Sequence, residues 1–211
     1  MSPTTTPAAS ARRSPNSTRP SPSSRPEAPA DRRNSRASHR AGAYHARMMT
    51  LSDVLSVLGL LERAGTDVVI AGGWGVDALL GEQTREHRDL DLLHVREQEG
   101  AVVAALEAAG YAETLDRRPA RFVLSHPDGP EIDLHPLEFA PDGSAVQSSL
   151  DPERPFHYPA ACFVTGTLGT ATVRCLSAGQ QALFHQGYEP AGRDLADMAR
   201  LREKFGVETH F

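Results

Sequence analysis

The chain has little cysteine, little lysine and no long apolar run. Two cysteines in 211 residues are too few for a disulfide framework or a four-ligand zinc site. No apolar stretch approaches the roughly 20 residues that a membrane-spanning helix needs, so we expect a cytoplasmic protein without a membrane segment. Lys204 is the only lysine, so the other basic side chains are arginines.

The first 47 residues lack valine, isoleucine, leucine, phenylalanine and tryptophan, and they carry nine arginines against two acidic residues. Such a segment cannot bury enough apolar surface to offset its conformational entropy. We expect a disordered basic tail over 1–47 and one folded domain over 48–211. The tail resembles a transit peptide or a nucleic-acid-binding arm, but it also fits a solvated extension ahead of a natural start at Met48 or Met49.

Residues 48–211 are acidic, with 13 basic and 25 acidic side chains. This balance argues against sequence-independent binding of nucleic acid, which requires a basic face. It suits neutral or cationic small substrates and divalent metal ions.

Apolar periodicity and turn residues predict a mixed α+β fold. The expected helices cover 50–64, a short stretch that follows a glycine turn at 72–75 and runs through Leu80, 98–110, 177–187 and 191–205, and the expected strands cover 67–71, 90–95, 111–115, 120–126, 131–139, 161–167 and 170–176. Residues 140–160 are expected to form a proline-rich loop. A hairpin turn at Leu168-Gly169 would set Cys162 opposite Cys175, where a disulfide is conceivable, although reduced thiols are expected in the cytoplasm.

Two of the expected strands carry acidic or histidine side chains at every second position. These are His87, Asp89 and Asp91 in the first, and Asp133 and His135 in the second. Residues two apart share one face of a strand, so the leucines and the isoleucine between them point into the core. Close carboxylates raise one another's pKa unless a cation neutralises them, and oxygen ligands favour Mg²⁺ or Mn²⁺ over zinc. A solvated sheet face would show the same alternation.

Gly72 and Gly73 follow the first expected strand directly. Glycine lets backbone N–H groups approach a phosphate closely, and the start of the following helix adds a positive dipole. The spacing matches neither the dinucleotide-binding fingerprint nor the P-loop, and a double glycine alone is more often only a turn.

Together these features resemble the nucleotidyltransferase superfamily, in which a Gly-Gly turn precedes Asp-x-Asp and a later third Asp. The segment 72–79, followed by Gly81, Thr84-Arg85, His87 and Asp89-Leu90-Asp91, looks like the small lincosamide and aminoglycoside nucleotidyltransferases, and 133–136 and 183–188 are similar to the lincosamide enzymes in particular. The resemblance spans about 65–205. It implies a mixed sheet flanked by helices, with further helices at the C-terminus.

The resemblance implies metal-dependent transfer of a nucleoside monophosphate, expected to be AMP, from ATP or another NTP. The acceptor would be a hydroxyl of a small molecule such as a lincosamide or an aminoglycoside, and pyrophosphate would be released. Small enzymes of this kind often complete the acceptor pocket with a partner subunit, which makes a homodimer an expectation.

The implied roles follow the matching positions. Asp89 and Asp91 would bind Mg²⁺ or Mn²⁺, and Asp133 would be a third metal ligand, a general base, or both. Phosphate contacts are expected from Gly72, Gly73, Arg85 and Arg121, with Arg193 and Arg200 as further candidates. Four side chains would either orient the acceptor or serve the fold: His87, His135, His185 and Tyr188.

Two other functions stay open at this point. A metal-dependent hydrolase would use the same carboxylates and histidines, but it leaves the Gly72-Gly73 turn without a role. A non-catalytic nucleotide-binding or antitoxin-linked module would have a degenerate site, and the presence of all three carboxylates weighs against it.

Overall fold

A computed structural model describes residues 47–186 and 188–211. The expected tail over 1–47 lies outside the described residues, apart from Arg47. The helices are α1 (Leu51–Arg63), α2 (Gly72–Leu80), α3 (Glu99–Ala108), α4 (Ala178–Phe184) and α5 (Gly192–Phe205), with 3₁₀ turns η1 (Arg96–Gln98) and η2 (Ala160–Cys162). The strands are β1 (Val68–Ile70), β2 (Asp89–Val95), β3 (Ala112–Arg117), β4 (Arg121–Ser125), β5 (Glu131–Phe139), β6 (Ala145–Gln147), β7 (Phe156–Tyr158), β8 (Phe163–Leu168) and β9 (Ala171–Leu176).

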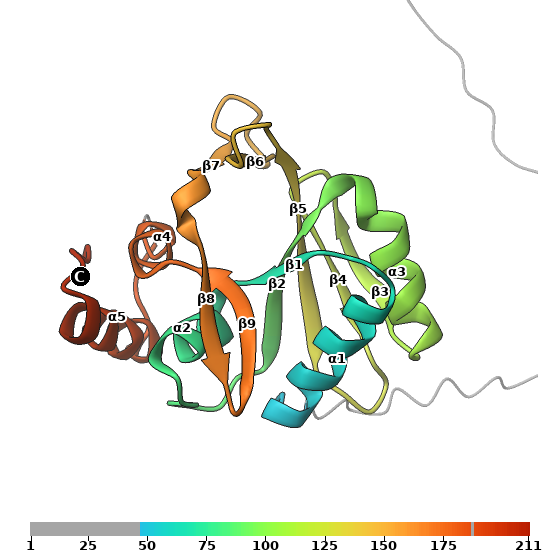
Figure 1. Ribbon diagram of the computed structural model, residues 1–211, viewed down its shortest axis with the longest axis horizontal. Coiled ribbons are helices and arrows are strands. Elements are labelled where there is room, and N and C mark those ends of the chain that lie inside the picture. The colour runs from blue at the N-terminus through green and yellow to red at the C-terminus, as the bar shows by residue number, and fades with distance from the viewer. Residues whose placement is uncertain (1–46, 187) are drawn as a thin grey trace, which may run out of the picture. The chain divides into compact units, whose positions relative to one another are not determined.

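The strands form one mixed sheet in the order β3-β4-β5-β2-β1-β9-β8, and β6 extends from β5 and pairs with β7. β2 pairs with β5 and β1 with β9 in parallel, while the remaining pairs are antiparallel. Helices α1 and α3 cover one face of this sheet, and α2, α4 and α5 gather near β8 and β9 (Figure 1). The expectation of a mixed sheet flanked by helices, with C-terminal helices, is confirmed.

The core is divided between the two faces of the sheet. The larger cluster packs α1 and α3 against Leu90 and Leu92 of β2 and against Ile132 and Leu134 of β5. A second cluster on the other face contains Leu93, and α2, α4 and α5 form a third with one another. None of the helices in the described part of the chain is long and apolar enough to cross a bilayer.

The expectation of a loop over 140–160 was wrong in part, because this segment contains β6 and β7. β6 pairs with the end of β5, with Phe139 opposite Ala145, and β7 then pairs with β6. Each strand has only three residues, too few to show a period of two. The pairing brings Gln147 and Tyr158 next to β5, where they contribute to the site described below.

The register expected for the last hairpin was also wrong. Leu168 pairs with Ala171, so the turn lies at Gly169-Thr170, and Cys175 faces Val164 instead of Cys162. The two cysteines are buried in separate clusters, Cys175 with the helices α1 and α3 and Cys162 with Leu93. Both thiols are free.

Candidate active site

The parallel pairing of β2 with β5 brings acidic side chains from distant parts of the chain together. Asp91 lies directly opposite Asp133 in the register, and Leu93 lies opposite His135. Leu90 and Leu92, which alternate with the acidic residues of β2, are completely buried on the other face. The alternation of residue types along each strand therefore sends the leucines into the core and the carboxylates to the opposite side.

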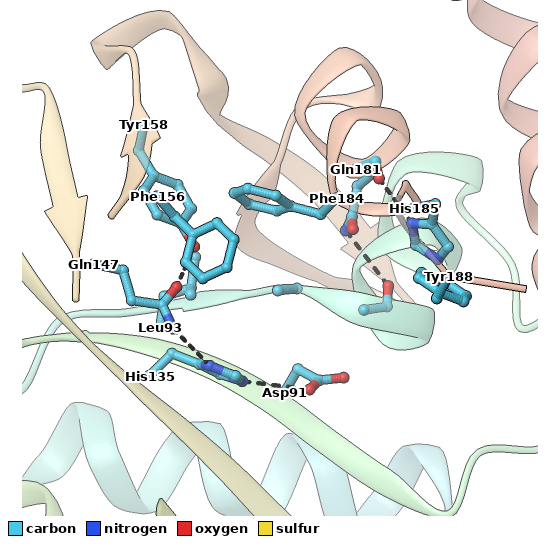
Figure 2. Close-up of a pocket in the computed structure, with 12 residues that line it drawn as sticks. Asp91, Leu93, His135, Gln147, Phe156, Tyr158, Gln181, Phe184, His185 and Tyr188 are labelled. Atoms are coloured by element: carbon cyan, nitrogen blue, oxygen red, sulfur yellow. Dashed lines mark hydrogen bonds and ion pairs between the residues drawn. The ribbon is translucent and has the colours of Figure 1, made fainter. Parts of the chain in front are cut away.

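Asp91, Asp133 and His135 form a cluster in which one potential ligand atom of each lies within 4.8 Å of the others. His135 Nε2 lies 3.5 Å from Asp91 Oδ1 and 3.6 Å from Asp133 Oδ1. Figure 2 shows the imidazole of His135 turned toward Asp91. The three side chains belong to adjacent strands, so the sheet itself fixes their spacing.

One carboxylate oxygen of Asp133 has a partner, and the other has none. Arg121 forms an ion pair with Oδ2, whereas Oδ1 is buried without a hydrogen-bond partner. Burial raises the pKa of Asp133, and the nearby Asp91 adds to the rise. A buried carboxylate oxygen without a partner is costly, and a divalent cation shared with Asp91 would satisfy it, so these side chains fit a metal ion with oxygen ligands.

Asp89, the first residue of β2, is not part of that cluster. Its side chain lines a polar groove of about 370 Å³ together with Arg121, Glu131 and Asp133. Burial, followed by the charge of Asp91, raises the pKa of Asp89. The sequence-based prediction paired Asp89 with Asp91 as metal ligands and added Asp133 as a third carboxylate, whereas the geometry pairs Asp91 with Asp133 and sets Asp89 on the groove side.

The glycine turn lies directly against the carboxylates. Gly72 is the first residue of α2 and has a left-handed φ of 57°, and a Cβ at this position would overlap the carboxylate of Asp91. The N-cap residue Ala71 provides no side-chain cap for α2. The helix therefore presents uncapped backbone N–H groups and the positive end of its dipole beside the acidic cluster, an arrangement that binds phosphate.

His87 does not join the carboxylates, which corrects the expectation that it shares their face. β2 begins only at Asp89, and His87 is 2% exposed, with its Nε2 2.5 Å from Asp77 Oδ2. Its ring lies 4.5 Å from the ring of Trp74. A Cβ at Gly73 would overlap His87 and Arg85, so the ring of His87 packs directly against the glycine turn.

The arginines expected at phosphate have partners of their own. Arg85 donates to the buried carboxylate of Asp197 on α5 at 2.8 Å, and Arg200 lies 3.6 Å from the same carboxylate. The positive charge of Arg193, on α5, opposes the rise in the pKa of Asp89. The guanidinium of Arg85 borders the glycine turn, since a Cβ at Gly73 would meet it.

A pocket of about 280 Å³ opens beside Gly72 and Asp91 (Figure 2). The sequence singled out three further residues of its lining, His135, His185 and Tyr188. The other lining residues are Ala71, Leu93, Gln147, Phe156, Tyr158, Gln181 and Phe184. His185 and Tyr188, whose roles the sequence left open, lie on its wall. Gln147, Phe156 and Tyr158 were missed because they come from β6 and β7, which were expected to be loop.

Comparison with known proteins supports one class. A sequence model described as aminoglycoside-2''-adenylyltransferase matches residues 53–201. A lincosamide resistance protein from Staphylococcus haemolyticus is 30% identical over 154 residues, which cover 73% of this chain and 95% of that protein. Over a shorter stretch of 54 residues, 26% of this chain and 30% of the relative, a 2''-aminoglycoside nucleotidyltransferase from Escherichia coli is 37% identical.

Solved structures agree with this. The crystal structure of the lincosamide antibiotic adenylyltransferase LnuA with bound lincomycin is 31% identical, with a TM-score of 0.68, and the match covers 74% of this chain and 98% of that one. The structure of ANT(2'')-Ia in complex with adenylyl-2''-tobramycin shares the fold at 19% identity and a TM-score of 0.58, over 74% and 89% of the two chains.

The fold and the paired carboxylates beside a glycine turn are those of a nucleotidyltransferase. The chain belongs to the aminoglycoside-2''-adenylyltransferase family, and a lincosamide resistance protein is among its relatives. The resemblance seen in the sequence is thereby confirmed. Membership in a family of nucleotidyltransferases also decides against the two alternatives, a hydrolase and a non-catalytic module.

Proposed function

We propose that this enzyme transfers AMP from ATP to a hydroxyl group of a lincosamide antibiotic and releases pyrophosphate. The observation that carries the proposal is the placement of Asp91 opposite Asp133, beside the uncapped start of α2 at Gly72. Similarity over nearly the whole length of two lincosamide proteins favours a lincosamide over an aminoglycoside as the acceptor.

The backbone of α2 would hold the triphosphate. The N–H groups at the start of α2 donate to phosphate oxygens, and the helix dipole adds a favourable field. Arg85, which borders the turn, would add positive charge there, and Arg193 would add positive charge near Asp89. Since the attacking and leaving oxygens lie in line across the phosphorus, the acceptor hydroxyl would enter from the side away from the pyrophosphate held at Gly72.

The carboxylates would hold the divalent metal ion, which we propose to be Mg²⁺ or Mn²⁺. The ligands are Asp91 and Asp133, with Asp89 beside them, and the bound metal stabilises negative charge on the reacting phosphate. Because burial raises the pKa of Asp133, this carboxylate accepts a proton more readily than an exposed one. Asp133 is thus suited to take the proton of the acceptor hydroxyl as a general base.

The test is an assay of pyrophosphate release with ATP, Mg²⁺ and either lincomycin or tobramycin, with mass spectrometry of the antibiotic. We expect an AMP adduct of lincomycin, and a loss of kcat of at least about 100-fold in Asp91→Asn. Asp142→Asn, in an exposed loop, serves as the control and should keep full activity. An active Asp91→Asn enzyme would refute the site, and an adduct of tobramycin alone would refute the acceptor.

The finer expectations about assembly and domain limits belong to the same proposal. We propose that residues 48–211 carry the whole catalytic domain, that the enzyme works in the cytoplasm, and that it forms a homodimer. The family match covers residues 53–201, which lie within this range, and this supports the domain limit. Sedimentation analysis of the purified protein measures the oligomeric state.

A further inference from the structure

A chain of buried hydrogen bonds leads from β7 through β6 to the acidic cluster. The hydroxyl of Tyr158 donates to Gln147 Oε1 at 2.6 Å. The amide nitrogen of Gln147 lies 2.9 Å from the carbonyl oxygen of Ala120 and 3.0 Å from His135 Nδ1. Gln147 is 6% exposed and Tyr158 2% exposed, so water does not compete freely for these bonds. Figure 2 shows the amide of Gln147 between Tyr158 and His135.

The partners of Gln147 determine how its amide is oriented. A backbone carbonyl only accepts hydrogen bonds, so the group that faces Ala120 must be the NH₂ group. Tyr158 confirms this orientation, since its hydroxyl then has the amide oxygen as acceptor. The two protons of the amide nitrogen therefore point at the carbonyl oxygen of Ala120 and at His135 Nδ1.

The orientation of the amide in turn fixes the imidazole. Nδ1 of His135 accepts a hydrogen bond, so in the neutral ring the proton is on Nε2. That nitrogen is the one that lies 3.5 Å from Asp91 Oδ1 and 3.6 Å from Asp133 Oδ1. A protonated ring nitrogen has no lone pair to offer a metal ion.

We propose that Gln147 is a positioning residue, which holds His135 so that an N–H donor, instead of a ligand atom, faces Asp91 and Asp133. The geometric cluster of two aspartates and one histidine then binds its cation through oxygen only, and His135 orients the two carboxylates from the side. The inference rests on the proposed function in so far as Asp91 and Asp133 are the metal-binding carboxylates. Oxygen-only ligation agrees with Mg²⁺ and disfavours zinc.

The tautomer is measured by two-bond proton–nitrogen correlation spectra of the ¹⁵N-labelled full chain, without nucleotide or antibiotic, at a pH about two units above the ordinary histidine pKa of about 6.5. His135→Phe assigns the resonances by their loss. We expect the proton of His135 on Nε2 in the wild-type protein. In Gln147→Glu, which has the same shape but faces Nδ1 with an oxygen acceptor, we expect it to move to Nδ1.

Kinetics provide the second readout. Gln147→Met and Gln147→Glu should lower kcat by about 10- to 100-fold, the usual cost of removing a group that orients metal ligands, while KM for ATP changes by less than about threefold. A purely structural role would lower the amount of folded protein and leave kcat per folded molecule unchanged. If Gln147→Met fails to fold, the isosteric Gln147→Glu carries the test.

Gln180→Met is the matched control. Gln180 is also 6% exposed and also donates to a backbone carbonyl, that of His157 at 3.2 Å, but it does not touch His135. Its variant should keep the wild-type spectrum and kcat. A proton on Nδ1 in the wild-type protein, or an unchanged tautomer and kcat in Gln147→Glu, would overturn the inference. The spectra require no turnover, so failure of the proposed function, seen as absent AMP transfer, is a separate result.

Discussion

His94 occupies a position on β2 where a positive charge is unfavourable. Its side chain is 1% exposed, Nδ1 lies 3.1 Å from the carbonyl oxygen of Val95, and Nε2 has no hydrogen-bond partner. The ring of Phe122 lies edge-on with its centroid 5.8 Å away. Burial is the main reason why the pKa of His94 is lowered, with smaller contributions from Arg118 and His135.

The lowered pKa of His94 makes stability depend on pH. The unfolded chain takes up the proton as pH falls through about 6.5, while the native state resists it, so stability is present above that pH and is lost below it, by at most about 1.4 kcal/mol per pH unit. His94→Leu should lose less unfolding free energy than the wild type between about pH 7 and about pH 5, measured by urea denaturation. His157→Leu, at an exposed position, is the control and should keep the wild-type slope. Equal slopes in wild type and His94→Leu would contradict this account.

Single residues differ in how far the sequence predicts their place. The alternation of Asp91 and Asp133 with leucines determines their face, because that information lies within each strand. His87 has the same spacing in sequence, yet it pairs with Asp77 of α2 and therefore does not face the carboxylates. Which histidine joins the carboxylates depends on contacts between elements, and local spacing does not contain them.

Among the elements, the start of α2 depends most directly on one glycine. Gly72 combines a φ of 57° with a Cα that packs against Asp91. A β-carbon there would be strained by about 1–2 kcal/mol and would also displace the carboxylate. The loss of function should therefore exceed the loss of stability.

Gly72→Ala should lower kcat by at least about 100-fold, since the metal-binding carboxylate and the phosphate-binding backbone are both displaced. Gly65→Ala is a control for backbone strain alone, because Gly65 has a φ of 70° and open space around it. Calorimetry should show a similar fall in Tm for both variants, and only Gly72→Ala should lose activity. A fully active Gly72→Ala enzyme would show that the turn does not hold the triphosphate.

Long periodic elements were predictable, whereas the short strands β6 and β7 were not. Helix α1 and strand β5 repeat their apolar residues over 13 and nine residues, enough for the pattern to emerge. β6 and β7 have three residues each in a proline-rich segment, and β6 pairs with Glu138 and Phe139 at the end of β5, beyond the residues that pair with β2 and β4. Gln147 was missed for this reason, since its importance comes from pairing and not from its neighbours in sequence.

At the scale of the whole molecule, the C-terminal helix secures the glycine turn. The ion pair of Arg85 with Asp197 connects the segment after α2 to α5, and Lys204 donates to the carbonyl oxygen of Leu80 at 2.6 Å. The buried side chain of Met198 packs α5 against α2. The start of α2, where we propose that phosphate binds, thus depends on residues more than 100 positions away in sequence.

We predict that a chain limited to residues 48–211 keeps the kcat of the full chain. The truncation removes Arg47, whose exposed pair with Asp53 contributes little because water screens it. Thermal unfolding and the adenylylation assay, run side by side on both chains, measure the effect. A large loss of kcat in the short chain would assign a function to the basic segment.

The overall class followed from sequence because the motifs of the family lie in continuous stretches. The strand order did not follow, since β1 pairs with β2 on one side and with β9 on the other, and β9 begins about 100 residues later. No local pattern encodes a parallel pairing over that distance. The apolar composition of a central strand such as β2 indicates burial, but not which strand lies beside it.

The central place of β1 has a consequence for synthesis on the ribosome. Until β9 has left the exit tunnel, one edge of β1 offers unpaired N–H and carbonyl groups, which invite pairing with other chains. A stalled nascent chain that ends before Ala171 would therefore be inactive and prone to aggregate. The cell gains a working enzyme only after β9 has been translated.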